Sequence, residues 1–200
     1  MARPRRSQQT REDLLREGVE LLSEQGYHGT GLKEILDRVK APKGSFYNYF
    51  ESKEAYTAEL IEHYTDHLLG LMDRYLEQAP DDPPTVIRNI YGLMIGEFEA
   101  HDCTQGCLLG NLAAEISAHH PRCQAALRRA FHAWEQRFVP LLERGQAKGQ
   151  FRSDIPAGAL AGLFWNAWEG GILRMKMEGS TQSLRATVDL LLDGVLAAPV

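Results

Sequence analysis

The sequence predicts an all-α fold, and three observations carry this prediction. Apolar residues recur every three or four positions along most of the chain, which is the period of an amphipathic helix. No segment shows the strict alternation of apolar and polar residues that is typical of a half-buried strand. Short stretches that contain glycine or proline, which end helices, separate the periodic segments. We therefore expect helices joined by short connections.

The first two helices are expected near the N-terminus. One extends from about Gln8 to Gln25 and ends near Gly26, because glycine tolerates the left-handed backbone that closes a helix. Its core-facing residues are Leu14, Leu15, Val19 and Leu22. A shorter helix begins after Thr30, whose hydroxyl group is expected to cap the first turn. The apolar residues of that helix are Leu32, Ile35, Leu36 and Val39.

A third short helix is expected from Lys43 to Phe50. Ala41-Pro42 ends the second helix, since proline has no amide proton and disfavours helical backbone in the residue before it. Phe46 and Phe50 are four residues apart and are expected to pack inward. Two short helices joined by such a turn are typical of a helix-turn-helix motif.

The outer face of this third helix suits the major groove of duplex DNA. Lysine binds phosphate, glycine allows close approach of the backbone, serine and asparagine bond to base edges, and tyrosine hydroxyls bond to phosphate. An ordinary helical hairpin with an aromatic core is the alternative, and the turn chemistry disfavours it. The candidate DNA-contact residues are Thr30, Lys33, Lys43, Gly44, Ser45, Tyr47, Asn48, Tyr49 and Lys53.

The rest of the chain is predicted to form longer helices. One extends from about Lys53 to Gln78 and stops at the proline-rich segment 79–84. The others are expected near residues 84–101, 105–118, 121–148, 156–178 and 181–197. The last two are unusually apolar, which indicates either a subunit interface or the core of a single chain.

Charge is distributed unevenly along the 200 residues, whose formal net charge is −5. Residues 1–53 contain ten Lys or Arg against eight Asp or Glu, whereas the remainder contains twelve against nineteen. DNA binding would therefore depend on individually placed cations. Arg3, Arg5 and Arg6 could form an arm along phosphates or in a minor groove, or a solvated tail.

Cysteine number and hydropathy exclude several classes of protein. The three cysteines, Cys103, Cys107 and Cys123, are odd in number and lack CxxC spacing, which disfavours a disulfide framework and a structural zinc site. No apolar segment reaches the length of a membrane span, and no secretory signal follows the basic start. We expect a cytoplasmic protein with no metal, cofactor or membrane association.

Segment 26–53 resembles the TetR family of bacterial transcription regulators. The residues that carry the resemblance are Gly26-Tyr27, Thr30, Ile35, Lys43-Gly44-Ser45-Phe46-Tyr47, Tyr49-Phe50 and Ser52-Lys53. The resemblance implies a TetR-like fold of about nine helices, with a DNA-binding helix-turn-helix domain at 1–53 and a ligand-binding and dimerisation domain at 54–200. It also implies repression as the default and a homodimer formed through the last two helices. Such a dimer would place two recognition helices about 34 Å apart on a palindromic double-stranded operator.

Two segments of the predicted body, 106–117 and 164–178, combine apolar residues with polar or reactive ones and are candidates for an effector site. Cys107 lies at the expected start of a helix, where free amides and the helix dipole favour the thiolate; a small buried hydrophobe is the alternative. Trp165 and Trp168 could form the wall of an apolar pocket or fill the core. The polar groups expected to orient a ligand are Tyr91, Asn111 and Glu169.

A cationic residue could complete this effector site. Lys176, or alternatively Arg174, could lower the pKa of a nearby thiol or neutralise a ligand carboxylate, although a solvated surface position is the simpler interpretation. The segment Gly106-Cys107-Leu108 is similar to a TetR subgroup that includes regulators of acrylate use and of reactive-electrophile reductases. The other matching residues are Trp165, Trp168-Glu169-Gly170 and Arg174-Met175-Lys176.

This similarity implies a repressor released from DNA by a small reactive or unsaturated inducer, either through covalent modification of Cys107 or through docking of an unsaturated acid. A small detoxifying enzyme with Cys107 as its nucleophile is the alternative from another class. Its base would be His101, His119 or His120. The chain has no phosphate loop, nucleophile elbow or metal-spaced cluster, so we expect no enzyme.

Overall fold

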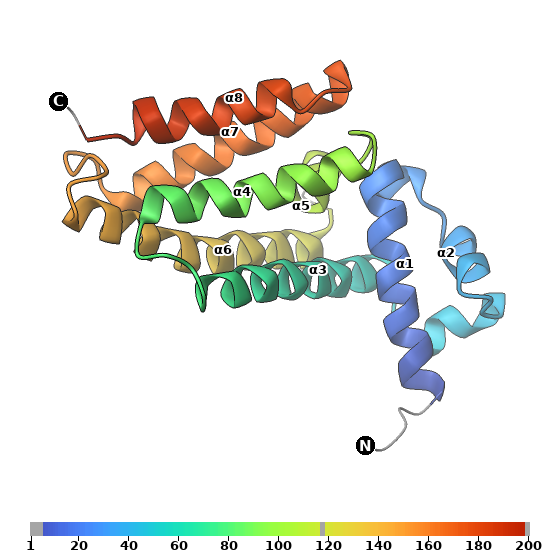
Figure 1. Ribbon diagram of the computed structural model, residues 1–200. Helices are drawn as coiled ribbons and strands as arrows, with labels where there is room; N and C mark the ends of the chain where they lie inside the picture. The colour runs from blue at the N-terminus through green and yellow to red at the C-terminus, as the bar shows by residue number, and fades with distance from the viewer. Residues whose placement is uncertain (1–5, 117–118, 199–200) are drawn as a thin grey trace. The chain divides into compact units, whose positions relative to one another are not determined.

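The computed structural model describes residues 6–116 and 119–198. Across these residues it contains eight α-helices, a 3₁₀ helix and a π-helical turn, with one isolated β-bridge between Phe151 and Ala197 (Figure 1). The elements are α1 (Arg6–Gly29), α2 (Leu32–Arg38), η1 (Lys43–Asn48), α3 (Lys53–Leu76), α4 (Pro83–Ala100), α5 (Leu108–Glu115), α6 (Pro121–Ala147), α7 (Ala157–Glu178), α8 (Gln182–Leu190) and η2 (Leu191–Val195). The all-α prediction is confirmed.

The helices belong to two compact units. The first unit comprises Met1–His67 and Cys107–Ala130, and the second comprises Leu68–Gly106 and Phe131–Val200. Both α3 and α6 contribute residues to each unit. The first unit includes α5, which packs against α1.

Two helices differ in kind from the prediction. The third predicted helix is the 3₁₀ helix η1, with bonds from the N–H of Ser45 to the carbonyl of Pro42 and from the N–H of Tyr49 to the carbonyl of Phe46. A short run that contains a glycine favours this tighter geometry over an α-helix. The last predicted helix ends as an α-helix at Leu190 and continues as η2. The end expected for α5, at residue 118, lies outside the described residues.

The start of α2 corrects the predicted role of Thr30. The N-cap residue is Gly31, and no side chain caps this helix. The chain bends at Gly26, whose φ is 74°, and the bend directs Thr30 inward. The Thr30 hydroxyl is fully buried and donates a hydrogen bond to the Gly26 carbonyl at 2.8 Å. Thr30 therefore stabilises the end of α1 and does not cap α2.

An aromatic cluster forms the core of the first unit. Phe46, Phe50 and Tyr56 are buried, and their ring centroids lie 4.8–5.5 Å apart. The hydroxyl of Tyr56 donates to the carbonyl of Leu14 at 2.7 Å, which satisfies the buried polar group. Gly18 leaves the space for that hydroxyl, since a Cβ there would lie 1.7 Å from it. The inward packing predicted for Phe46 and Phe50 is confirmed.

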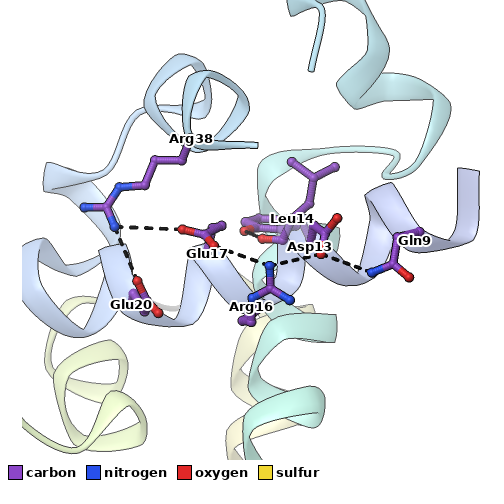
Figure 2. A network of polar contacts seen from close by, with 8 residues as sticks. Gln9, Asp13, Leu14, Arg16, Glu17, Glu20 and Arg38 are labelled. Carbon is purple, nitrogen blue, oxygen red and sulfur yellow. Dashed lines mark hydrogen bonds and ion pairs between the residues drawn. The ribbon is translucent and has the colours of Figure 1, made fainter. Parts of the chain in front are cut away.

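A polar network on the surface of the first unit joins α1 to α2 (Figure 2). Arg38 of α2 lies 3.9 Å from the Glu17 carboxylate and 3.4 Å from that of Glu20. Arg16 bridges Asp13 and Glu17 along α1. Each exposed pair contributes about 0–1 kcal/mol. The network therefore orients α2 more than it stabilises the fold.

The second unit is built around α7, which packs against α8, and α8 in turn packs against α4 (Figure 1). Gly171 allows the close approach of α7 to α8, because a Cβ there would lie 2.7 Å from a methyl group of Leu184. The core contains a cluster of aromatic rings from α4, α6 and α7. Its members are Tyr91, Phe98, Phe131, Trp134, Phe138, Phe164, Trp165 and Trp168.

Candidate nucleic-acid interface and effector region

The outer face of η1 carries the exposed polar groups that the sequence predicted. Tyr47 is 68% exposed, and Gly44 and Asn48 are also exposed. A Cβ built at Gly44 would meet nothing within 4 Å, so the backbone there is open to a large ligand. Ser45 is half-buried, and its hydroxyl donates to the Pro42 carbonyl at 2.6 Å, which fixes the start of η1. Its lone pairs can still accept a hydrogen bond.

The remaining predicted DNA-contact residues differ in exposure. Lys33 lies exposed on α2, and Tyr49 is half-buried at the end of η1. The side chain of Lys43 lies outside the part of the structure that is described, as do Arg3 and Arg5. The backbone of Arg6 already belongs to α1.

The polar groups of Lys53 and Thr30 bind backbone carbonyls at the bend between α1 and α2. The Lys53 ammonium donates to the carbonyls of Tyr27 and Thr30 at 2.5 and 2.7 Å, and it lies 4.4 Å from the centre of the Tyr27 ring. Partial burial lowers the pKa of Lys53. The first residue of α3 thus binds the carbonyls that follow the bend in α1. Both residues hold the backbone behind the DNA-contact face.

Cys107 and Asn111 both belong to the first unit. Cys107 is the N-cap residue of α5, as expected, but it is only 6% exposed. The side-chain amide of Asn111 donates to the Ser23 carbonyl of α1 at 3.0 Å, so this donor is used in packing the two helices. Sequence alone missed this role, because the two residues are 88 positions apart.

Cys123, the cysteine at the start of α6, has an environment that opposes the thiolate. Its thiol donates to the Glu54 carbonyl at 3.4 Å. Burial, and then the nearby Glu54 carboxylate, raise the pKa of Cys123 to about 11. The thiol is therefore protonated at neutral pH and is a poor nucleophile.

The other predicted effector residues belong to the second unit. Trp168 and Tyr91 are buried, with ring centroids 4.6 Å apart, and both fill the core. Trp165 is half-buried against Trp134, at 4.8 Å between ring centroids. Glu169, the next residue after Trp168, is half-buried. Tyr91, Trp165 and Trp168 therefore pack as core residues, and their burial does not favour the wall of a pocket.

The two candidate cations at the end of α7 have different surroundings. Arg174 is exposed and forms an ion pair with Glu178 at 2.7 Å, four residues along the same helix. Hydrogen bonds, first from Arg174 and then from Ser183, lower the pKa of Glu178. Lys176 is half-buried. Arg174 therefore has the solvated surface position that the sequence analysis gave as the simpler interpretation.

A groove of about 540 Å³ lies within the second unit, where sequence analysis expected no site. Its walls come from the end of α3, from α4 and from α8: Tyr75, Arg88, Asn89, Gly92, Leu93, Ile95, Arg185, Val188 and Asp189. Both guanidinium groups are paired, Arg88 with Asp189 and Asp193, and Arg185 with Glu99 at 2.9 Å. The groove depends on helices distant in sequence, so local patterns gave no signal of it.

Several large apolar side chains are exposed on the outer faces of α7 and α8. They are Leu163, Leu173, Met177 and Leu190, and Met177 is 85% exposed. Exposed apolar clusters of this kind mark interaction surfaces. Among the described residues, no cluster of three or more His, Cys, Asp or Glu could hold a metal ion. None of the described helices is both long and apolar enough to cross a bilayer.

A polar, exposed η1 supported by an aromatic core, following a short helix and a tight turn, defines a helix-turn-helix DNA-binding protein. Residues 14–60 match the family model for "Bacterial regulatory proteins, tetR family", and residues 83–191 match the "Tetracyclin repressor-like, C-terminal domain". The chain therefore belongs to the TetR family. It is a ligand-responsive DNA-binding transcriptional regulator and not an enzyme.

Three proteins illustrate the similarity. The HTH-type transcriptional repressor DhaR of Mycobacterium sp. (strain GP1) is 31% identical, over 93% of this chain and 92% of its own length. The transcriptional regulator AcuR of Cereibacter sphaeroides is 36% identical, over 84% of this chain and 76% of its own. The crystal structure of the reduced form of Escherichia coli NemR has a TM-score of 0.85 at 26% identity, covering 96% of this chain and 99% of that one. AcuR and NemR support the predicted subgroup.

Proposed function

We propose that this regulator is a cytoplasmic repressor that leaves a palindromic operator when a small reactive or unsaturated compound binds. Residues 1–53 would bind DNA, and residues 54–200 would bind the effector and dimerise. The observation that carries the proposal is the exposed face of η1, which presents Tyr47, Asn48 and the open backbone of Gly44. The names of DhaR and NemR as repressors support the direction of regulation.

The DNA-contact set is proposed to be smaller than the sequence suggested. Lys33, Gly44, Tyr47 and Asn48 are exposed and chemically suited to phosphate or base edges. We retain Lys43, Ser45 and Tyr49 as contacts at the two ends of η1. Thr30 and Lys53 are assigned to the support of this face, because their polar groups bind backbone carbonyls.

Homodimerisation is proposed to occur through α7 and α8. Leu173 and Met177 are four residues apart on α7 and strongly exposed, and Leu190 is exposed on α8. A second copy of the chain would cover this surface around a twofold axis. The two copies of η1 would then meet adjacent major grooves of a palindromic site, about 34 Å apart.

The inducer is proposed to be an electrophile or an acrylate-like acid. In the covalent account, the Cys107 thiol gives its proton to solvent and the sulfur adds to one carbon of an activated C=C bond. The π electrons pass to the other carbon, which takes up a proton from solvent. The N-terminus of α5 favours the thiolate. In the docking account, Lys176 binds the carboxylate of the acid, since Arg174 is paired with Glu178. The resemblance of the 106–108 and 164–178 segments to acrylate- and electrophile-responsive regulators supports both accounts.

Binding of the purified protein to its own upstream DNA tests the proposal. We expect specific binding that acrylate or N-ethylmaleimide weakens, with Tyr47→Ala as the binding-deficient control. Cys107→Ser should abolish the response to N-ethylmaleimide in the covalent account, and Lys176→Ala the response to acrylate in the docking account. Absence of specific binding to any neighbouring promoter would overturn the proposed function.

A further inference from the structure

The bend between α1 and α2, here called the α1–α2 corner (residues 26–31), is held by side chains from two other helices. Lys53 of α3 donates to the carbonyls of Tyr27 and Thr30. Glu115, the last residue of α5, accepts a hydrogen bond from the backbone N–H of His28 at 2.9 Å. The corner is thus bound through its carbonyls by a cation and through an N–H group by a carboxylate.

The fit between Glu115 and Gly26 is close. A Cβ built on Gly26 would lie 1.8 Å from the Oε1 atom of Glu115, so the carboxylate occupies space that only glycine leaves free. The φ of 74° at Gly26 independently favours glycine. Backbone conformation therefore requires glycine at this position, and the Glu115 carboxylate occupies the space beside it.

Glu115 and Asn111 both form hydrogen bonds to α1 from a single face of α5. Asn111 and Glu115 are four residues apart, so their side chains emerge on the same side of the helix. Asn111 donates to the Ser23 carbonyl at 3.0 Å, one turn before the corner. The Glu115 carboxylate also acts on the Lys53 ammonium, where it opposes the lowering of the pKa of Lys53 by burial.

We propose that Glu115 is a positioning residue for DNA binding, which holds the α1–α2 corner so that α2 and η1 present their outer faces correctly. The inference rests on the proposed function, because it concerns affinity for the operator. It predicts that operator affinity depends on a residue of α5 that does not itself contact DNA. It also gives Glu115 and Gly26 a shared role in holding the corner. The helix-turn-helix segment alone does not indicate this role, because Glu115 lies outside it.

Two variants of Glu115 and one matched control test the proposal. Glu115→Ala removes the acceptor for the His28 N–H, whereas Glu115→Gln keeps an acceptor oxygen and removes the charge. Glu62→Ala is the control, since it also removes a carboxylate from an interhelical ion pair of the first unit, the one with Arg129 at 2.5 Å. Hydrogen exchange of the backbone amides at 26–31 is measured without DNA, and operator affinity is measured by fluorescence anisotropy.

In Glu115→Ala, we expect the backbone amides of the α1–α2 corner to exchange about tenfold faster than in the wild type. We also expect operator binding to be about tenfold weaker. Both effects follow from the loss of a charged hydrogen bond. Glu115→Gln should lie between this variant and the wild type, and Glu62→Ala should match the wild type in both measurements. Should Glu115→Ala fail to fold, Glu115→Gln supplies the same comparison at preserved side-chain size.

Two results would overturn the proposal. Unchanged exchange in both Glu115 variants would show that the carboxylate does not hold the corner. Faster exchange with unchanged operator affinity would show that the corner does not position η1. Failure of the wild type itself to bind any operator would reject the proposed function and the DNA-binding role of Glu115 with it, while the exchange rates would still report separately on the corner.

Discussion

The two units contain similar aromatic cores but present different outer surfaces. In the first unit, Phe46 and Phe50 pack against Tyr56, and the residues between them form a polar, exposed face on η1. In the second unit, the rings around Trp168 fill the interior, while leucine and methionine side chains are exposed on α7 and α8. A polar surface can bind DNA alone, whereas an exposed apolar surface requires a partner.

The sharpest test of this comparison uses two adjacent residues of η1. Phe46→Ala should lower the free energy of unfolding by about 3–5 kcal/mol, because the ring is fully buried. Tyr47→Ala should change stability by no more than about 0.5 kcal/mol, since the ring is exposed, yet weaken operator binding about tenfold. Urea unfolding and anisotropy measure the two effects. If Tyr47→Ala binds the operator as tightly as the wild type, the assignment of Tyr47 to the DNA-contact face is wrong.

A second pair of substitutions tests how strongly backbone and packing together require glycine at position 26. Gly26 and Gly149 have similar φ values, 74° and 69°, but a Cβ at Gly149 would meet no atom within 4 Å. Gly149→Ala should cost about 1–2 kcal/mol of stability from backbone strain alone. Gly26→Ala should cost about 1–3 kcal/mol more, because its ψ of −177° lies in a region that only glycine adopts readily and because a Cβ there displaces the Glu115 carboxylate. Equal losses in thermal or urea unfolding would show that the Glu115 contact contributes nothing.

The apolar surface of the second unit is tested by inserting a charge. Met177→Glu should shift the proposed dimer toward monomer, because dimerisation through α7 and α8 would bury an unpaired carboxylate. The resulting loss of operator affinity should be on the order of tenfold or more, since paired half-sites bind together. Sedimentation velocity measures the oligomeric state. Leu71→Glu, at another exposed apolar position on α3, is the control and should leave the dimer intact.

The smallest predicted effect concerns acid stability in the second unit. Arg137 donates to both carboxylate oxygens of Asp73, at 2.8 and 2.9 Å, and these hydrogen bonds lower the pKa of Asp73. The pair therefore stabilises the fold above the unfolded pKa of about 4, and this contribution is lost as the pH falls through the lower folded pKa. Because the pair is exposed, Asp73→Asn should cost only about 0–1 kcal/mol at pH 7. The wild type and the variant should converge in urea unfolding near pH 2.

Sequence predicted the parts of the molecule that depend on local pattern. Helical periodicity located α3, α4, α6 and α7, and the four-residue spacing of Phe46 and Phe50 predicted their burial. Residue type alone gave a wrong cap at Thr30, because Gly31 is the N-cap residue of α2, and it did not indicate how the Lys53 ammonium is bound. The bend at Gly26 brings the polar groups of both to backbone carbonyls instead.

The unpredicted features depend on contacts between residues distant in the chain. Glu115 and His28 are 87 positions apart, and Arg88 and Asp189 in the groove are 101 apart. Neither pair lies in a motif whose spacing indicates contact, so only the packing of whole helices brings them together. The burial of Cys107 likewise depends on what surrounds the start of α5 and not on the residues beside it in sequence.

Helix α5 has 8 residues and is therefore only about 12 Å long. Cys107 precedes its first residue and Glu115 is its last, so this one short helix connects a candidate chemical sensor to the α1–α2 corner. A displacement of about 1 Å at its far end would stretch the 2.9 Å bond from the His28 N–H beyond hydrogen-bonding range. The hydrogen-exchange rate of the His28 backbone amide, measured before and after alkylation of Cys107, would test this coupling directly.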